Sequence, residues 1–386
     1  MNVLYLTDVA YPWTKGGSEL RIARLAEYLT RRGDSVKIIC GRWWAGSRDP
    51  PGVIGVPLIS QVYDRRRSIP SAISFTLSAA KALGNLAENF DIVEFNQSPF
   101  LHFSLIDLLG RSRPLREARI VGMLHEAWQE YWLRYSLLGG LVGYGLERRA
   151  MDSLDYIITI SEFTKRRFLR WPVSQSKIGV IHPGVDFAAI SEVAPSTDSS
   201  DLIFVGRLVE DAHVERLVEA VRLLHVHHGI EVRATVVGGG PMFGPLRRLA
   251  SSLGVSEAIR FAGPLENHAS VYSLLKSSRL FLLPSAPHGG WNIASMEANA
   301  AGLPVVTPSR SEIGFAGELV DPGHSGLIVD DESPESLASA VHDLLVDESA
   351  RSRMGGEAAD RAKRFEWDAV CEQTASVYES VISRQA

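Results

Sequence analysis

The segment FLLPSAPHGGWNIASMEANAAGLPVVTP, at residues 281–308, constrains the fold more than any other part of the sequence. It begins with an apolar run that is typical of a buried strand, and a loop with two glycines follows. Asn292 is a residue type that caps helices, and Gly302 is one that ends them. A strand, a loop, a helix and a second strand in this order predict a parallel α/β sheet. In such a sheet the loop lies at the edge where ligands bind, although an ordinary strand–helix connection gives the same pattern.

This alternation of strands and helices occurs in two successive series. The predicted strands are 3–7, 36–40, 91–95, 118–124 and 156–160 in the first series, and 202–205, 233–237, 258–262, 280–283, 304–307 and 326–329 in the second. A polar stretch at 191–200 separates the two series and suits a linker. We therefore expect two Rossmann-like, doubly wound domains, 1–190 and 201–366. A C-terminal helix at 367–386 follows and can return to the first domain.

The composition is that of an ordinary soluble protein with room for two cores, since 45% of the 386 residues are hydrophobic. Cys40 and Cys371 are the only cysteines, too few for a disulfide framework or a zinc cluster, and a reducing compartment fits. No basic segment precedes the first apolar run, and no apolar run reaches 18 residues. We therefore expect neither a signal peptide nor a transmembrane helix, and a cytoplasmic location.

Charge is distributed unevenly along the chain. Residues 1–190 carry 24 lysines and arginines against 18 acidic residues, a net charge of +6, whereas the remainder carries 16 against 27, or −11. Basic clusters such as 65–67 and 165–167 are either solvated faces or part of a contact with an anionic membrane surface at the inner face of the membrane. The second interpretation includes the neighbouring aromatic residues Trp128, Tyr131, Trp132 and Tyr135. No nucleic-acid-binding motif accompanies the charge, so no nucleic-acid partner is expected.

Two positions favour a phosphate-bearing ligand. Arg207 follows a predicted strand directly, where a guanidinium can pair with phosphate oxygens, although an arginine in a loop is often only a solvated charge. Gly16 and Gly17 open the first helix, where backbone amides can approach an anion or simply turn the chain. Neither pattern decides the function alone.

Taken together, the motifs resemble those of the retaining glycosyltransferase family 4, over nearly the whole chain. The matching segments are GGSE at 16–19, LHE at 124–126, ITISEFTKRR at 158–167, HPGVD at 182–186, FVGRL at 204–208, VVGGGP at 236–241, RFAG at 260–263, LLPS at 282–285, MEANAAGLPVV at 296–306 and GELVDPGHSGLIV at 317–329. The resemblance implies a GT-B fold with a cleft between the domains. It also implies transfer from a nucleotide-sugar donor to a glycan, a lipid-linked or a small-molecule acceptor, with no further cofactor and no metal.

The resemblance also implies roles for particular residues. His125 and Arg207 would be catalytic, His125 near the reacting sugar and Arg207 at the diphosphate. Glu297 matches the second glutamate of the family's E-x(7)-E motif and would bind the nucleotide ribose. The implied donor-binding set is Gly16, Gly17, Arg207, Gly289, Gly290, Trp291, Asn292, Ile293, Glu297, Gly314 and Glu318.

Two positions depart from the family pattern. Gly289 stands where the first glutamate of E-x(7)-E is expected, beside His288, and Ala212 stands where a phosphate-binding lysine is common, before His213. Loss of a transition-state charge partner costs a few kcal/mol, or about a hundredfold in rate. Three interpretations stay open at this point: an active subgroup with altered donor contacts, a weak or inactive sugar-nucleotide-binding relative, and an unrelated α/β function.

Overall fold

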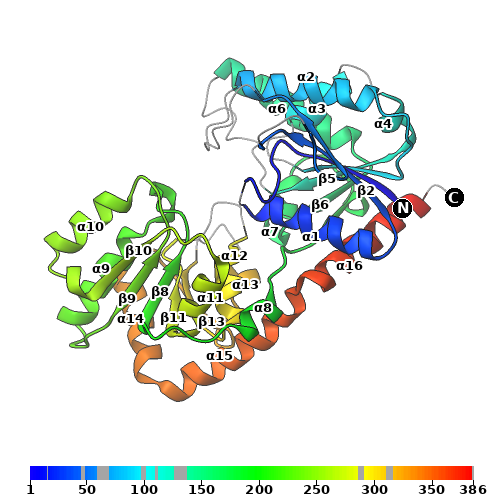
Figure 1. Ribbon diagram of the computed structural model, residues 1–386. Helices are drawn as coiled ribbons and strands as arrows, with labels where there is room; N and C mark the ends of the chain where they lie inside the picture. The colour runs from blue at the N-terminus through cyan, green and yellow to red at the C-terminus, as the bar shows by residue number, and fades with distance from the viewer. Residues whose placement is uncertain are drawn as a thin grey trace. The chain divides into compact units, whose positions relative to one another are not determined.

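The computed structural model describes residues 1–14, 16–44, 48–58, 69–96, 101–108, 112–125, 137–285, 291–309 and 316–384. The chain folds as two compact units (Figure 1). The first unit is Met1–Pro183 with Asp368–Ala386, and the second is Gly184–Trp367. No helix in these ranges is both long enough and apolar enough to span a bilayer.

The first unit contains a parallel sheet of seven strands in the order β3-β2-β1-β4-β5-β6-β7. The strands are β1 (Asn2–Leu6), β2 (Ser35–Gly41), β3 (Val53–Val56), β4 (Ile92–Asn96), β5 (Arg119–Leu124), β6 (Tyr156–Thr159) and β7 (Ile178–Val180). The helices are α1 (Gly17–Arg31), α2 (Ile69–Gly84), α3 (Leu101–Leu108), α4 (Arg113–Glu117), α6 (Leu137–Ser153), α7 (Glu162–Phe168) and α16 (Trp367–Ser383). Five of these strands were predicted, whereas the edge strands β3 and β7 were not.

The second unit contains a parallel sheet of six strands in the order β10-β9-β8-β11-β12-β13. The strands are β8 (Ser200–Val205), β9 (Ala234–Val237), β10 (Ile259–Gly263), β11 (Ser278–Leu282), β12 (Val305–Pro308) and β13 (Gly326–Val329). The helices are α8 (Phe187–Glu192), α9 (Glu215–Val226), α10 (Phe243–Ser252), α11 (His268–Lys276), α12 (Ile293–Ala300), α13 (Ala316–Leu319), α14 (Pro334–Val346) and α15 (Glu348–Ala362). All six predicted strands are present, which confirms the α/β prediction of two Rossmann-like sheets.

The stretch expected to be a linker, 191–200, lies inside the second unit. It joins α8 to β8 and is fastened to α11, because the Ser196 backbone N–H donates to the Ser273 carbonyl over 3.0 Å. The Ser273 hydroxyl in turn donates to the Ala194 carbonyl over 2.8 Å. The chain passes from one unit to the other between Pro183 and Gly184, and again between Trp367 and Asp368.

Helix α16 packs in the first unit beside α1 (Figure 1). Two ion pairs join the helices, Arg31 to Asp368 at 2.6 Å and Arg32 to Glu379 at 2.8 Å. Exposed pairs of this kind contribute little, so the buried contacts of the same helix, described below, hold it in place.

Candidate functional site

The second sheet reverses its winding direction between β8 and β11. From β8 the chain proceeds through β9 to β10 on one side, and from β11 through β12 to β13 on the other. Loops diverge at such a switch point, and open α/β sheets bind ligands there, at the carboxyl ends of the strands. Arg207, which is exposed, follows β8, and α12 follows the loop after β11. The structure thus places both sequence-predicted segments at the switch point.

Glycines shape the loop that carries Arg207. Gly238 has a φ of 137°, and a Cβ on it would lie 1.8 Å from the Gly206 carbonyl oxygen. Gly240 has a φ of 151°, and a Cβ there would lie 2.3 Å from the Leu208 carbonyl oxygen. Only glycine accepts both the conformation and the close approach. The VVGGGP motif therefore supports the loop on either side of Arg207.

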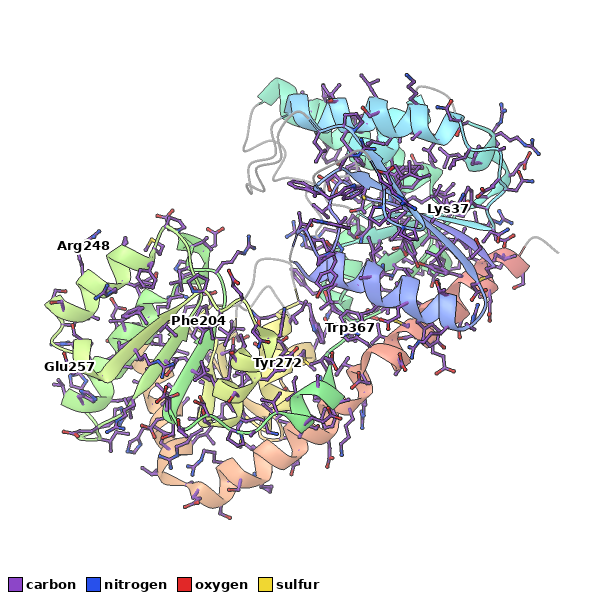
Figure 2. All side chains as sticks on the ribbon, viewed as in Figure 1. Lys37, Phe204, Arg248, Glu257, Tyr272 and Trp367 are labelled. Carbon is purple, nitrogen blue, oxygen red and sulfur yellow. The ribbon has the colours of Figure 1, made fainter. Side chains whose placement is uncertain are left out.

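Glu297 lies on α12 and is half-buried. Tyr272, which lies on α11 (Figure 2), donates a hydrogen bond to the Oε1 atom of Glu297 over 3.4 Å. Burial raises the pKa of Glu297 from an ordinary 4.5 to about 7, since desolvation disfavours the charged form. The Tyr272 hydrogen bond opposes this rise in pKa, and the negative charge of Asp186 adds to it. Among the described residues, Tyr272 donates a long hydrogen bond to this carboxyl group, and hydroxyl groups of a ligand would further stabilise its charged form.

The residues that open α12 have mainly structural contacts. The Asn292 Oδ1 atom accepts from the Ser295 backbone N–H over 2.8 Å, so the predicted helix cap is confirmed. Trp291 is buried, with its ring 5.5 Å from that of Phe365. Ile293 is the first residue of the helix.

Glu318 and three glycines complete the predicted donor-binding set. Glu318 lies in α13, where its backbone carbonyl accepts a hydrogen bond from Arg361. Gly289, Gly290 and Gly314 lie outside the described residues.

The position of the expected lysine is occupied by alanine, in a turn that carries two acidic residues. Ala212 ends a short 3-10 helix, Glu210–Ala212, and His213 follows with a φ of 48°. The Nδ1 atom of His213 lies 2.9 Å from Oε1 of Glu215. His213, which lies between the two helices, is therefore engaged by the first residue of α9, Glu215.

In the first sheet, His125 and Asn96 lie side by side at the ends of two adjacent strands. His125 comes directly after β5, and Asn96 ends β4, at the carboxyl edge. The His125 Nε2 atom lies 2.9 Å from Asn96 Oδ1, and Asn96 Nδ2 donates to the Ser18 carbonyl over 3.4 Å. Since an amide oxygen only accepts, Nε2 carries the proton and Nδ1 is the acceptor nitrogen. Sequence reasoning found His125 but missed Asn96, although its place at the end of a strand next to the switch point was a usable signal.

His125 is neutral at physiological pH. Burial, together with the positive charge of Arg21, lowers its pKa from 6.5 to about 4. The imidazole can therefore orient a hydroxyl group without placing a positive charge beside it.

Gly16 and Gly17 open α1, but an internal carboxylate already lies there. A Cβ on Gly16 would come within 2.5 Å of Oε2 of Glu19, which is buried and also accepts from the Ser18 hydroxyl over 2.9 Å. A negative charge in the first turn is favourable for the helix. The anion expected at this glycine pair thus competes with a carboxylate of the chain.

A buried polar network lies beneath this edge. Arg21 donates to both carboxylate oxygens of Glu94, over 2.6 and 3.2 Å, and both side chains are at most 2% exposed. Tyr378 of α16 donates to Glu94 over 2.6 Å and lies 3.2 Å from the hydroxyl of Tyr5. The network joins β1, α1, β4 and α16, which explains why the C-terminal helix belongs to the first unit.

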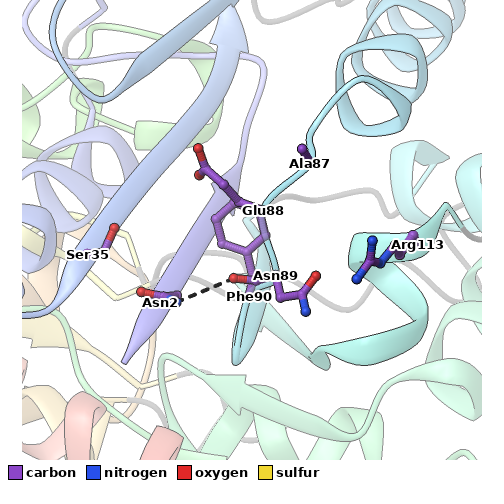
Figure 3. Close-up of a pocket in the computed structure, with 7 residues that line it drawn as sticks. All are labelled: Asn2, Ser35, Ala87, Glu88, Asn89, Phe90 and Arg113. Carbon is purple, nitrogen blue, oxygen red and sulfur yellow. Dashed lines mark hydrogen bonds between the residues drawn. The ribbon is translucent and has the colours of Figure 1, made fainter.

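A surface hollow lies at the opposite edge of the first sheet (Figure 3). Asn2 and Ser35, at the amino ends of β1 and β2, line it together with Glu88 and Arg113. Asn2 donates to the Asn89 carbonyl across it over 3.5 Å. It lies away from the carboxyl edge, so it does not coincide with the candidate site. Among the described residues, no three His, Cys, Asp or Glu side chains are grouped to hold a metal ion.

Two family models match the chain in succession. The family described as Glycosyltransferase Family 4 matches residues 15–189, and the one described as Glycosyl transferases group 1 matches residues 187–361. The chain belongs to glycosyltransferase family 4. Membership accounts for the order of the motifs along both units.

Curated relatives of this family 4 protein act on different acceptors by their names. A D-inositol 3-phosphate glycosyltransferase of Corynebacterium glutamicum is 27% identical over 258 residues, 62% of this chain and 60% of the relative. An MMP alpha-(1->4)-mannosyltransferase of Mycolicibacterium hassiacum is 24% identical and matches 96% of both chains. The matches to the first five curated relatives span only 52–60% of those proteins.

Solved structures show the same fold. The sucrose-phosphate synthase of Thermosynechococcus elongatus has a TM-score of 0.80 at 16% identity and covers 100% of both chains. Anabaena HepE in complex with UDP-glucose has a TM-score of 0.73 at 18% identity and covers 98% of this chain and 100% of its own. The family 4 protein thus has the GT-B fold, as the motifs predicted.

Proposed function

We propose that this family 4 protein transfers a sugar from a nucleotide-diphosphate sugar to an acceptor hydroxyl, with retention of the anomeric configuration. The observation that carries the proposal is Glu297, a half-buried carboxyl group at the switch point whose pKa is raised to about 7. The first curated relatives of the chain are named glycosyltransferases, and the structure of HepE was solved with UDP-glucose, which supports the proposal.

The donor contacts follow from the chemistry of the second unit. Glu297 accepts hydrogen bonds from the two ribose hydroxyls, which lower its pKa and restore its charge. Arg207, exposed at the end of β8, pairs with the diphosphate. The amides at the start of α12 add partial positive charge.

The reaction needs charge stabilisation at the leaving group. The bond between the anomeric carbon and the diphosphate oxygen breaks, and its electron pair leaves with the nucleoside diphosphate. The acceptor oxygen bonds to the same carbon on the same face, and its proton passes to the departing phosphate oxygen. Arg207 stabilises the charge that develops on the diphosphate.

His125 positions a hydroxyl of the reacting sugar rather than moving a proton. Its Nδ1 atom accepts a hydrogen bond, because Nε2 is held by Asn96. With a pKa near 4 it does not become protonated at neutral pH.

Membrane contact belongs to the same proposal, since many acceptors are lipid-linked. Leu141 and Val142 are exposed on α6, and Arg148 and Arg149 are exposed two turns later on the same helix. Apolar side chains with nearby arginines suit an anionic membrane surface. Sedimentation with phosphatidylglycerol vesicles, for the wild type and Leu141→Asp, tests it.

A weak or inactive binding protein is the second candidate function. It is favoured by Ala212, which brings no charge to the β8 loop, and by His213, which Glu215 already engages. Such a protein binds a nucleotide sugar but releases no nucleoside diphosphate when acceptors are added.

Calorimetry with UDP, GDP and ADP tests donor binding. We expect Glu297→Ala and Arg207→Ala each to weaken binding at least tenfold, since charge-assisted hydrogen bonds contribute about 1.5–3 kcal/mol. Glu219→Gln is the matched control, because Glu219 is also a half-buried carboxyl with a raised pKa but lies on α9. Unchanged affinity in both folded variants refutes the assignment. Release of nucleoside diphosphate from nucleotide sugars, with and without acceptors, separates the two candidates.

A further inference from the structure

Two exposed aromatic residues lie at the carboxyl edge of the first sheet. Tyr11 and Trp13, in the loop after β1, are 41% and 39% exposed. Among the described residues, the other large aromatic side chain with this degree of exposure is Tyr144, on α6. Aromatic surface left in water beside a ligand-binding edge is typical of a contact site.

This loop is fastened before any ligand binds. The Thr14 hydroxyl accepts from the Ala10 N–H over 3.0 Å, and the Thr14 N–H donates to the Ala10 carbonyl over 2.9 Å. Ala10 packs on Cys40 and Trp44, and the Trp13 ring lies 4.6 Å from that of Trp44. Trp13 is thus supported on one side and exposed elsewhere, so little conformational freedom is lost on binding.

Three described acidic side chains lie near this loop, one of them paired with an arginine. Asp8 lies in the same loop, and the Glu19 carboxylate lies against Gly16 at the start of α1. Arg42, at the end of β2, is paired with Asp49 over 2.9 Å. Among the described side chains named here, three carboxylates accompany one guanidinium. A phosphate group would meet this edge unfavourably.

We propose that the acceptor of this enzyme is an uncharged saccharide whose pyranose ring stacks on Trp13, beside Tyr11. This inference rests on the proposed transferase function and narrows its acceptor. The C–H groups on one face of a pyranose ring carry partial positive charge and suit the negative face of an aromatic ring. The hydroxyls around the edge of the stacked sugar ring remain available for hydrogen bonds to the protein.

Saturation-transfer NMR tests the stacking directly. The probes are methyl α-D-glucopyranoside, methyl α-D-mannopyranoside, maltose and, as the phosphorylated comparison, D-inositol 3-phosphate. We expect at least one neutral sugar to bind, with saturation concentrated on protons of one ring face. Trp13→Ala should weaken that binding at least tenfold, and Trp13→Phe no more than threefold, because a ring remains.

Tyr144→Ala is the matched control. Tyr144 is 38% exposed and its ring lies 4.4 Å from that of Trp171, a setting like that of Trp13, but on α6. We expect this variant to bind the sugar within twofold of the wild type.

The affinity for UDP, GDP and ADP is measured on the same samples to separate two failures. If no nucleotide binds the wild type, the transferase proposal fails. If a nucleotide binds but no neutral sugar does, or if Trp13→Ala binds sugar normally, the saccharide inference alone fails. Tighter binding of D-inositol 3-phosphate, or loss of phosphatidylglycerol-vesicle binding as the sole effect of Trp13→Ala, also overturns it.

Discussion

Replacing Glu297 with glutamine is expected to stabilise the second unit at neutral and alkaline pH while weakening donor binding. The wild-type carboxyl group is half-buried, and in the folded protein its pKa is about 7 instead of the ordinary 4.5. Keeping it charged above pH 7 therefore costs folding free energy. Glutamine has nearly the same shape and no charge, so it avoids this cost and still accepts the Tyr272 hydrogen bond.

The magnitude follows from the two pKa values. A difference between about 7 and 4.5 corresponds to about 3 kcal/mol, and partial exposure of Glu297 brings the expected value to between about 1 and 3 kcal/mol. Because the folded state binds this proton more tightly, the contribution of Glu297 to wild-type stability is greatest below pH 4.5 and is lost as the pH rises to about 7. The advantage of Glu297→Gln should therefore be small near pH 5, increase to pH 7 and stay constant above it.

Thermal unfolding from pH 5 to pH 8 measures this difference. About 1–3 kcal/mol corresponds to a rise in Tm of roughly 3–10 °C at pH 8 for a unit of this size. Glu332→Gln is the control of opposite sign, because Glu332 forms an ion pair with Arg216 over 2.8 Å and its neutralisation should lower the Tm. A Glu297→Gln variant that is less stable at pH 8, or whose Tm difference does not change with pH, would refute the reasoning.

Three other predictions concern the first unit and the two family departures. Tyr378→Phe removes a donor from a buried carboxylate, so urea unfolding of the first unit should show a loss of about 1.5–3 kcal/mol; an unchanged midpoint would contradict the network's role. Asn96→Asp places a carboxylate beside His125, so the NMR titration of that imidazole should move up from a pKa of about 4; no movement would contradict the contact. Gly289→Glu with Ala212→Lys should raise nucleoside diphosphate release about tenfold if the site is weakened, by adding a transition-state partner; a fall in rate would indicate an adapted site.

The central strands and helices were predictable because their apolar periodicity is strong. β1, β4, β8 and β11 are buried strands bounded by turn residues, and α12 begins at its predicted cap, Asn292. The edge strands β3 and β7 are four and three residues long and partly exposed, so local pattern barely distinguishes them from loops. No family motif marks them, whereas the motif at 317–329 marks the equally short edge strand β13. These two segments become strands because β2 and β6 offer them an edge to pair with, and not because of a strong pattern in their own sequences.

The candidate site was predictable only where a motif marks it. Glu297 and Arg207 follow from the family pattern, whereas Tyr272, which contacts Glu297, is 25 residues away on another helix. The buried contact between Tyr378 and Glu94 spans 284 residues, a separation that no local pattern reports. Pairings of this kind arise because the fold packs helices and strands together regardless of their distance in the sequence.

Proton release on donor binding tests the central claim most directly. Nucleotide sugars contain phosphate diesters that do not titrate near neutrality, so a released proton must come from the protein. Isothermal titration at pH 7 in two buffers of different ionisation enthalpy, with the best-binding UDP-, GDP- or ADP-sugar, counts these protons. With the pKa of Glu297 at about 7, we expect about half a proton released by the wild type and none by Glu297→Gln, with at least tenfold weaker binding in the variant. Equal proton release and equal affinity in the two proteins would show that Glu297 does not bind the donor.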